Sequence, residues 1–225
     1  MARTIAKDYD AKRGHILKTA ARVFAKEGVA RASMNHVARE CGISKANIYH
    51  YYSSKDALLF DILDSYLSAL RDRICNLPLG GLPAREKLHR IVEQTLLAYD
   101  GMDHEHKIQT EGLPLLPEEQ QSVLRGYQRD MVRQLGDVLA EIEPDVFRND
   151  PVKLRATTMS VFGMLNWLYM WNPRADSQAR QECARRVTRR ACDGLGGLCG
   201  ICGRNRRGSC GSAGRSGGCG GGGGG

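Results

Sequence analysis

Residues 33–55 read SMNHVARECGISKANIYHYYSSK, and this stretch decides the fold. Ser33 is a candidate N-cap for a short helix whose apolar residues keep helical spacing, and Gly42 is placed to end that helix. Ser44 is a candidate N-cap for a second short helix over residues 45–52. Two short helices joined by a turn of about three or four residues that contains glycine form a helix-turn-helix. The stretch therefore predicts that motif.

The second of these helices carries residue types suited to reading double-stranded DNA. Ile48 and Tyr52 lie four residues apart and are expected to face the interior. In a helix-turn-helix the second helix lies in the major groove, where Asn47 can pair with adenine and Lys45 with guanine or a phosphate. An aromatic packing cluster is the alternative explanation for the run at residues 49–52. The candidate DNA contacts on this helix are Lys45, Asn47, Tyr49 and His50.

Helical patterns continue on both sides of the motif. Asp10 is a candidate cap for a first helix that ends at Gly28, and Ser53 or Ser54 for a long helix that runs to about Cys75. No segment shows sustained strand alternation, so we predict an all-α protein with an N-terminal three-helix DNA-binding domain and a C-terminal helical domain. The later helices are expected over residues 84–98, 117–142, 151–171 and 175–193.

Charge divides the 225-residue chain into three parts. The net charge of +8 is the sum of +7 in residues 1–55, −3 in residues 56–193 and +4 in residues 194–225. A basic first quarter on a slightly acidic body indicates a face that binds a polyanion, with a merely well-solvated surface as the alternative. We expect a DNA-binding domain over 1–55, a helical domain over 56–193 and a tail over 194–225.

The tail differs from the rest of the chain. It holds 16 of the 26 glycines and three large aliphatic residues, so it is expected to be flexible and without a packed core. Cys199 and Cys202 have the spacing of a zinc knuckle or redox pair, but Cys210 and Cys219 form no second such pair. We therefore expect no metal and no cofactor, and the tail resembles an unselected C-terminal extension.

Several other classes of protein find no support in the sequence. The longest apolar stretch, residues 161–171, is too short for a membrane span, and no secretory signal is visible, so a cytoplasmic protein without a membrane partner is expected. The common phosphate-binding, nucleophile and zinc-protease motifs of enzymes are missing, which favours a non-enzymatic function. The acidic and histidine side chains of residues 103–106, DHEH, could suggest a metal site. A solvated polar segment or loop is favoured instead, because side chains two residues apart on a helix point to different faces.

Between residues 32 and 59 the chain places ASM, VA, CGISK, IYHYY, SK and LL at spacings that resemble those of TetR/AcrR transcriptional regulators. One departure is Tyr52, where the family usually has phenylalanine, and its added hydroxyl needs a partner. The match covers about residues 10–60. The set of DNA-binding residues that the motif and the resemblance together imply is Ser33, Asn35, Ser44, Lys45, Asn47, Tyr49, His50 and Lys55.

The resemblance also implies partners. It implies a homodimer through helices within residues 151–193, a near-palindromic DNA operator, and repression relieved by a small molecule; activation is the alternative outcome. Residues 163–171 resemble a segment of regulators of fatty-acid, steroid or aromatic-acid breakdown, which often sense acyl-CoA thioesters. Core or dimer packing is the alternative role for the candidate ligand residues, which are Phe162, Gly163, Asn166, Trp167 and Met170.

A rival from another class is a helical small-molecule or metal-binding protein with an incidental basic N-terminus. It predicts no salt-dependent binding to duplex DNA, whereas a regulator should lose affinity steeply as salt rises.

Overall fold

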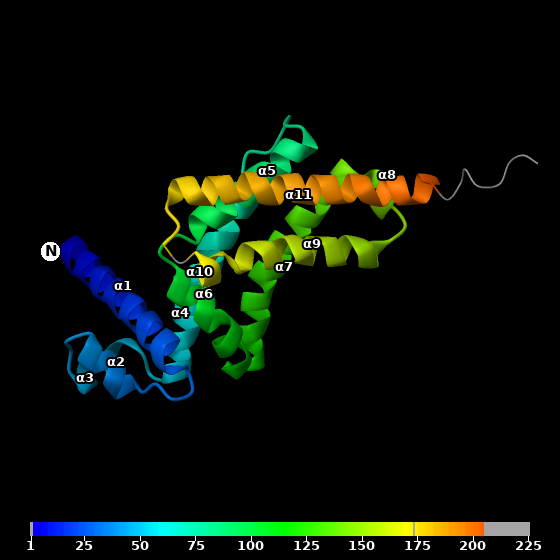
Figure 1. The fold of residues 1–225 in the computed structure, drawn as a ribbon. Helices are drawn as coiled ribbons and strands as arrows, with labels where there is room; N and C mark the ends of the chain where they lie inside the picture. The colour runs from blue at the N-terminus through cyan, green and yellow to red at the C-terminus, as the bar shows by residue number, and fades with distance from the viewer. Residues whose placement is uncertain (1, 173, 205–225) are drawn as a thin grey trace, which may run out of the picture.

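The computed structural model describes residues 2–172 and 174–204, and within them all regular structure is helical (Figure 1). The predicted all-α fold is confirmed for this part of the chain. The elements in order are α1 (Ala2–Glu27), α2 (Met34–Glu40), α3 (Lys45–Tyr51), α4 (Lys55–Cys75), α5 (Ala84–Ala98), α6 (Asp103–Gly112), the 3-10 helix η1 (Leu113–Leu115), α7 (Glu118–Ile142), α8 (Pro144–Phe147), α9 (Pro151–Asn166), α10 (Leu168–Trp171) and α11 (Ser177–Arg204).

Side-chain caps set the starts of α2, α3 and α4. Ser33 Oγ accepts a hydrogen bond from the His36 amide at 3.2 Å, and Ser44 Oγ accepts one from the Asn47 amide at 3.1 Å. Ser54 Oγ accepts one from the Ala57 amide at 3.0 Å. These bonds satisfy amides that a helix N-terminus otherwise leaves unpaired, so the predicted starts of the three helices are confirmed.

The first helix is longer than expected, because it starts at Ala2 rather than after Asp10. Asp10 lies inside the helix with an exposed side chain. The preceding residues are mostly good helix formers, and Lys12 Nζ pairs with Asp8 Oδ2 at 2.7 Å, the i, i+4 spacing that supports a helix. The cap signal at Asp10 therefore did not mark the start of the helix.

Three later elements also differ from expectation. The helix expected over 151–171 is divided at Trp167 into α9 and α10. Residues 103–106 belong to α6 rather than to a loop. The final helix α11 continues to Arg204, past the expected start of the tail at Gly194, because glycine weakens a helix without breaking it as proline does. Cys210 and Cys219 lie outside the described residues.

The helices form two connected groups in Figure 1. Helices α1–α3 gather at one end, and α4 leads from them into the larger group, where α11 lies along α5 and α9. Helix α6 packs against α1, and α7 packs against α4. None of the helices in the described part of the chain has the length and hydropathy needed to cross a membrane.

Candidate nucleic-acid interface and effector cavity

Helix α3 is fixed to the protein by one side. Ile48 is fully buried and Tyr52, which follows the helix, is 7% exposed, as the sequence predicts. Helix α2 contributes the buried Met34 and Val37 to the same core and packs against α3. Because these contacts hold one face of α3, its opposite face is presented to solvent.

Seven of the eight predicted DNA-binding residues are exposed, and four of them lie together on α3. The exposed fraction of Tyr49 is 44%, which is large for an aromatic side chain without a protein partner. The seven exposed residues are Ser33, Asn35, Ser44, Lys45, Asn47, Tyr49 and His50. The α3 group combines a cation, an amide, a phenol and an imidazole, which are groups that bind bases and phosphates.

Lys55 differs from the other seven residues. It is half-buried, and its ammonium group donates to the carbonyl oxygens of Val29 at 3.0 Å, Ala30 at 3.1 Å and Ala32 at 3.4 Å. These bonds use all three of its donors and hold the loop after α1 against the start of α4. Its phosphate contact stays a prediction, and the structure adds a role in holding that loop.

The hydroxyl of Tyr52 has the partner that it needs. Tyr52 Oη donates to Asp61 Oδ2 at 2.6 Å, and Arg13 Nε donates to the same oxygen at 3.0 Å. Arg13 Nη2 also pairs with the second carboxylate oxygen of Asp61. Burial, followed by the bond to Asp61, raises the pKa of Tyr52 well above its usual range, so the phenol stays protonated.

Tyr9 makes a contact that the sequence did not predict, because α1 was expected to start after it. Its ring stacks on Tyr51 with centroids 5.0 Å apart and an interplanar angle of 22°. Tyr51 therefore belongs to the packing of α1 against α3, as Tyr52 does, which agrees with the aromatic-cluster interpretation for these two residues. Tyr49 and His50 remain exposed.

A second feature is a cavity of about 190 Å³ among α4, α6, α7, α9 and Tyr99, the residue that follows α5. Two of the five predicted ligand residues, Phe162 and Asn166, line it. The remaining lining residues are Leu67, Leu70, Tyr99, His106, Gln109, Gln128, Met131, Val132 and Met159.

Hydrogen bonds at one side of this cavity involve residues of α4, α6 and α9 and Tyr99, which directly follows α5. Tyr66 Oη lies 3.0 Å from His106 Nδ1, and Tyr99 Oη donates to Asn166 Oδ1 at 2.9 Å. The rings of Tyr99 and His106 are 4.8 Å apart. Burial lowers the pKa of His106, and a hydrogen bond with the Asn166 backbone offsets part of this lowering. The imidazole is therefore neutral at pH 7.

His106 is a candidate site residue that sequence reasoning missed. The expectation of a solvated segment at 103–106 was wrong, because this turn of α6 packs inward and only His104 of the four residues is exposed, while the other three are half-buried. The sequence pattern gave no signal for it, because Ile108, two residues after His106, lies on another face of the helix and the residues on either side of His106 are charged. The described residues contain no group of three or more His, Cys, Asp or Glu side chains arranged to hold a metal ion.

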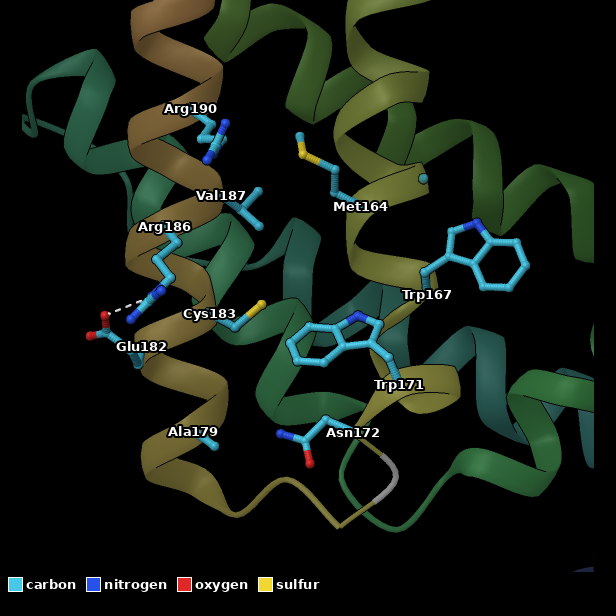
Figure 2. Close-up of a pocket in the computed structure, with 11 residues that line it drawn as sticks. Met164, Trp167, Trp171, Asn172, Ala179, Glu182, Cys183, Arg186, Val187 and Arg190 are labelled. Carbon is cyan, nitrogen blue, oxygen red and sulfur yellow. Dashed lines mark hydrogen bonds and ion pairs between the residues drawn. The ribbon is translucent and has the colours of Figure 1, made fainter.

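The other predicted ligand residues lie elsewhere. Gly163 and Trp167 line a groove of about 770 Å³ between α9, α10 and α11, which Figure 2 shows with Trp171 directed toward α11. Met170 is 57% exposed and lines neither this groove nor the cavity. The structure therefore does not bring the five predicted ligand residues into one pocket.

The side of the groove formed by α9 and α10 is apolar and strongly exposed. Trp167 and Trp171 are 60% and 65% exposed, and Met164 is 39% exposed. On the α11 side the groove is lined by Val187 and by the arginines of a basic helix face, one of which, Arg186, donates to Glu182 Oε1 at 3.0 Å. Contiguous exposed aromatic side chains of this kind mark interaction surfaces.

A capped helix-turn-helix with its second helix exposed, carried on an all-α body, defines a DNA-binding transcriptional regulator. Residues 16–62 match the family described as "Bacterial regulatory proteins, tetR family", and residues 81–195 match "Tetracyclin repressor-like, C-terminal domain". The chain belongs to the TetR family of transcriptional regulators.

Individual proteins agree with this assignment. The chain is 31% identical to a TetR-family transcriptional regulator from Bordetella parapertussis 12822 of known structure, with a TM-score of 0.75 over 80% of this chain and 94% of that one. The fold of AibR, solved with isovaleryl coenzyme A and operator DNA, is similar at 22% identity and a TM-score of 0.66, covering 79% of this chain and 96% of that one.

Among curated relatives, the uncharacterized regulator YerO from Bacillus subtilis (strain 168) is 37% identical over 81 residues, which is 35% of this chain. The match spans only 28% of the length of YerO.

Proposed function

We propose that this protein is a ligand-responsive repressor that binds a near-palindromic DNA operator as a homodimer. The observation that carries the proposal is the division of α3 into two faces. Ile48 and Tyr52 are buried, while the exposed face carries the four polar side chains of Lys45, Asn47, Tyr49 and His50.

Each exposed residue has a role that follows from its chemistry. Asn47 and Lys45 read base edges, because an amide suits adenine and an ammonium suits guanine. Tyr49 and His50 bind phosphate oxygens and set the position of the protein on the duplex. Ser33 and Ser44 use their oxygens as helix caps and keep their hydroxyl hydrogens for phosphate, and Asn35 is exposed in the first turn of α2.

We assign DNA binding to residues 1–55 and ligand binding and dimerisation to residues 56–193. The exposed Trp167 and Trp171 support a dimer through α9 and α11, because a second copy would cover this apolar surface.

We further propose that the effector is an acyl-CoA or a related hydrophobic acid and that its acyl group enters the cavity beside His106. The fold shared with AibR, which was solved with isovaleryl coenzyme A, supports this class of ligand. The position of the cavity also supports its role as the effector site. The cavity is lined by α6, which packs against α1, and by α4, which continues from the helix-turn-helix. Binding there has a short physical route to the DNA-binding helices.

The test is the affinity for duplex DNA at several salt concentrations, measured by fluorescence anisotropy. A regulator that neutralises about six to ten phosphates loses at least about a thousandfold in affinity between 50 and 200 mM salt. An acyl-CoA added at constant salt should then release the DNA. Binding that is absent at low salt would contradict the proposal and favour the helical ligand-binding protein, and no release by any acyl-CoA or free acid would remove the effector class.

A further inference from the structure

The side chains that line the cavity beside His106 are all uncharged in their usual states, with His106 the one group that titrates near neutral pH. None of the eleven described residues that line it is Lys, Arg, Asp or Glu. Its polar groups are the amides of Gln109, Gln128 and Asn166, the phenol of Tyr99 and the imidazole of His106. A ligand in this cavity therefore meets dipoles rather than full charges.

His106 is not placed to act as a counter-ion for an acid. Its Nδ1 lies 3.0 Å from Tyr66 Oη, and it also has a hydrogen bond with the Asn166 backbone. The pKa of His106 is lowered by burial, so at neutral pH a carboxylate entering the cavity would find no cation among the lining residues.

The amide groups provide hydrogen-bond donors. Asn166 Oδ1 accepts a hydrogen bond from the hydroxyl of Tyr99. The Nδ2 of Asn166, with its two N–H groups, is then the side-chain group that can donate to a ligand. Within the part of the chain that the structure describes, the side chains of Gln109 and Gln128 make no hydrogen bond. Half-buried amides whose N–H groups have no protein partner can donate to a ligand that supplies a complementary acceptor.

The volume limits the size of what enters. An apolar cavity of about 150 Å³ holds benzene, so a cavity of about 190 Å³ holds a group of about six to eight non-hydrogen atoms. A whole coenzyme A thioester exceeds this volume, but its short acyl group fits. Met159, which lines the cavity, is 48% exposed, so the cavity borders solvent at α9.

We propose that this cavity selects an uncharged group that bears a carbonyl, such as a short acyl thioester, amide or ester, and rejects the free carboxylate of the same chain length. This inference rests on the proposed function and narrows its effector class, because the carbonyl oxygen accepts from the side-chain amides. A carboxylate would have to leave water without an ion partner, which costs far more than burying a neutral dipole.

The experiment compares hexanamide with hexanoate, two compounds of the same shape with about eight non-hydrogen atoms each, within the range that fits the cavity. Binding to the full chain is measured at pH 7.5 by titration of protein amide resonances. Hexanamide should bind at least about tenfold more tightly than hexanoate, the factor that corresponds to about 1.4 kcal/mol. Hexanoyl-CoA should also bind more tightly than coenzyme A alone.

A cation placed in the cavity should reverse this preference. Gln109→Lys on α6 and Gln128→Lys on α7 each put an ammonium group beside the ligand, so each should bind hexanoate more tightly than hexanamide. Gln178→Lys is the charge-matched control, because Gln178 is exposed at the start of α11 and does not line the cavity. Two variants on different helices keep the test valid when one of them fails to fold.

Equal affinity for the two compounds, tighter binding of hexanoate, or no binding of either would overturn the inference. A Gln109→Lys variant that is folded and still prefers hexanamide would overturn it as well. These measurements use the free protein, so they do not depend on DNA. Duplex affinity without salt dependence would refute the proposed regulator separately, whatever the cavity binds.

Discussion

Tyr52 donates its hydroxyl to Asp61 across a distance of 2.6 Å, which joins the end of the α3 segment to the second turn of α4. Arg13 of α1 binds the same carboxylate. Residues of three helical segments therefore meet at one half-buried carboxylate. Helix α4 continues from this junction to the cavity, where its residues Leu67 and Leu70 form part of the lining. A shift of α4 would thus also move the end of α3 through the bond between Tyr52 and Asp61.

Replacing Tyr52 with phenylalanine should lower the free energy of unfolding by about 0.5–1.5 kcal/mol, the usual net value of one hydrogen bond. Asp61 keeps Arg13 as a partner, so the cost should stay in this range. Urea denaturation measures the change, and an unchanged duplex affinity is expected because Tyr52 is buried. Tyr49→Phe is the matched control, since Tyr49 is exposed and should cost little stability. A loss as large as that of a core truncation would contradict this view of the junction.

Lys55→Ala should weaken both the fold and DNA binding. Removing the ammonium leaves three carbonyl groups of the loop after α1 without this donor, at a cost of about 1–3 kcal/mol in the free energy of unfolding. Tyr49→Ala should weaken DNA binding without this loss of stability. Thermal unfolding and duplex affinity, measured on both variants, separate the two roles. A fully stable Lys55→Ala protein would show that the three hydrogen bonds contribute little.

Acid should destabilise the protein through His106. Because burial lowers the pKa of His106 in the folded state, the unfolded chain binds a proton at a higher pH than the folded chain does. The stability that His106 contributes is therefore complete above pH 6.5, its unfolded pKa, and is lost as the pH falls through its folded value.

The melting temperature of the wild type should accordingly fall between pH 7.5 and 5.5 by more than that of His106→Gln. His104→Gln is the control, because His104 is exposed two residues earlier on the same helix. An equal pH dependence for the wild type and His106→Gln would contradict the assignment.

Asn47→Ala and Tyr49→Ala should affect DNA binding in different ways. Loss of the Asn47 amide should change the preference at particular base pairs, at a cost of about 1–3 kcal/mol on the preferred sequence and little on random DNA. Tyr49→Ala should weaken binding to all duplexes by a similar factor. Competition assays with preferred and random duplexes provide the comparison. Equal losses on both duplexes for Asn47→Ala would contradict its base-reading role.

Trp171→Glu should weaken the homodimer. The side chain is 65% exposed in the single chain, so its replacement leaves the fold of the subunit intact but places a charge in the proposed interface. The dissociation constant of the dimer, measured by sedimentation, should rise at least about tenfold. Leu115→Glu is the control, because Leu115 is also exposed but lies on η1, away from α9 and α11. A dimer unaffected by Trp171→Glu would place the interface elsewhere.

The parts of the fold that local chemistry determines were predictable from the sequence. The starts of α2 and α3 follow from Ser33 and Ser44, and α5 has the predicted bounds because its apolar residues recur at helical spacing. The hydroxyl of Tyr52 required a partner, and Asp61 supplies it. For the helix starts the deciding groups lie within a few residues along the chain, whereas Asp61 lies nine residues after Tyr52, so the sequence predicted the need for a partner but not its identity.

The candidate effector site was only partly predictable, because it depends on which helix faces meet. Phe162 and Asn166 lie four residues apart and face the cavity, while Gly163 and Trp167 form the neighbouring pair and face the groove. The sequence shows both pairs but not which helices cover them. His106 was missed for the same reason, since it contacts Tyr66 of α4 and Tyr99, which follows α5, and both lie far from it in the sequence pattern of its own helix.

The most direct test of the central claim is selection of bound DNA from a random duplex pool at physiological salt. The account predicts a near-palindrome with two half-sites, because a symmetric dimer presents two copies of α3. The same selection with Asn47→Ala should change particular positions within each half-site. Recovery of no shared sequence by a protein shown to be folded and dimeric would contradict a sequence-reading role for the exposed face of α3.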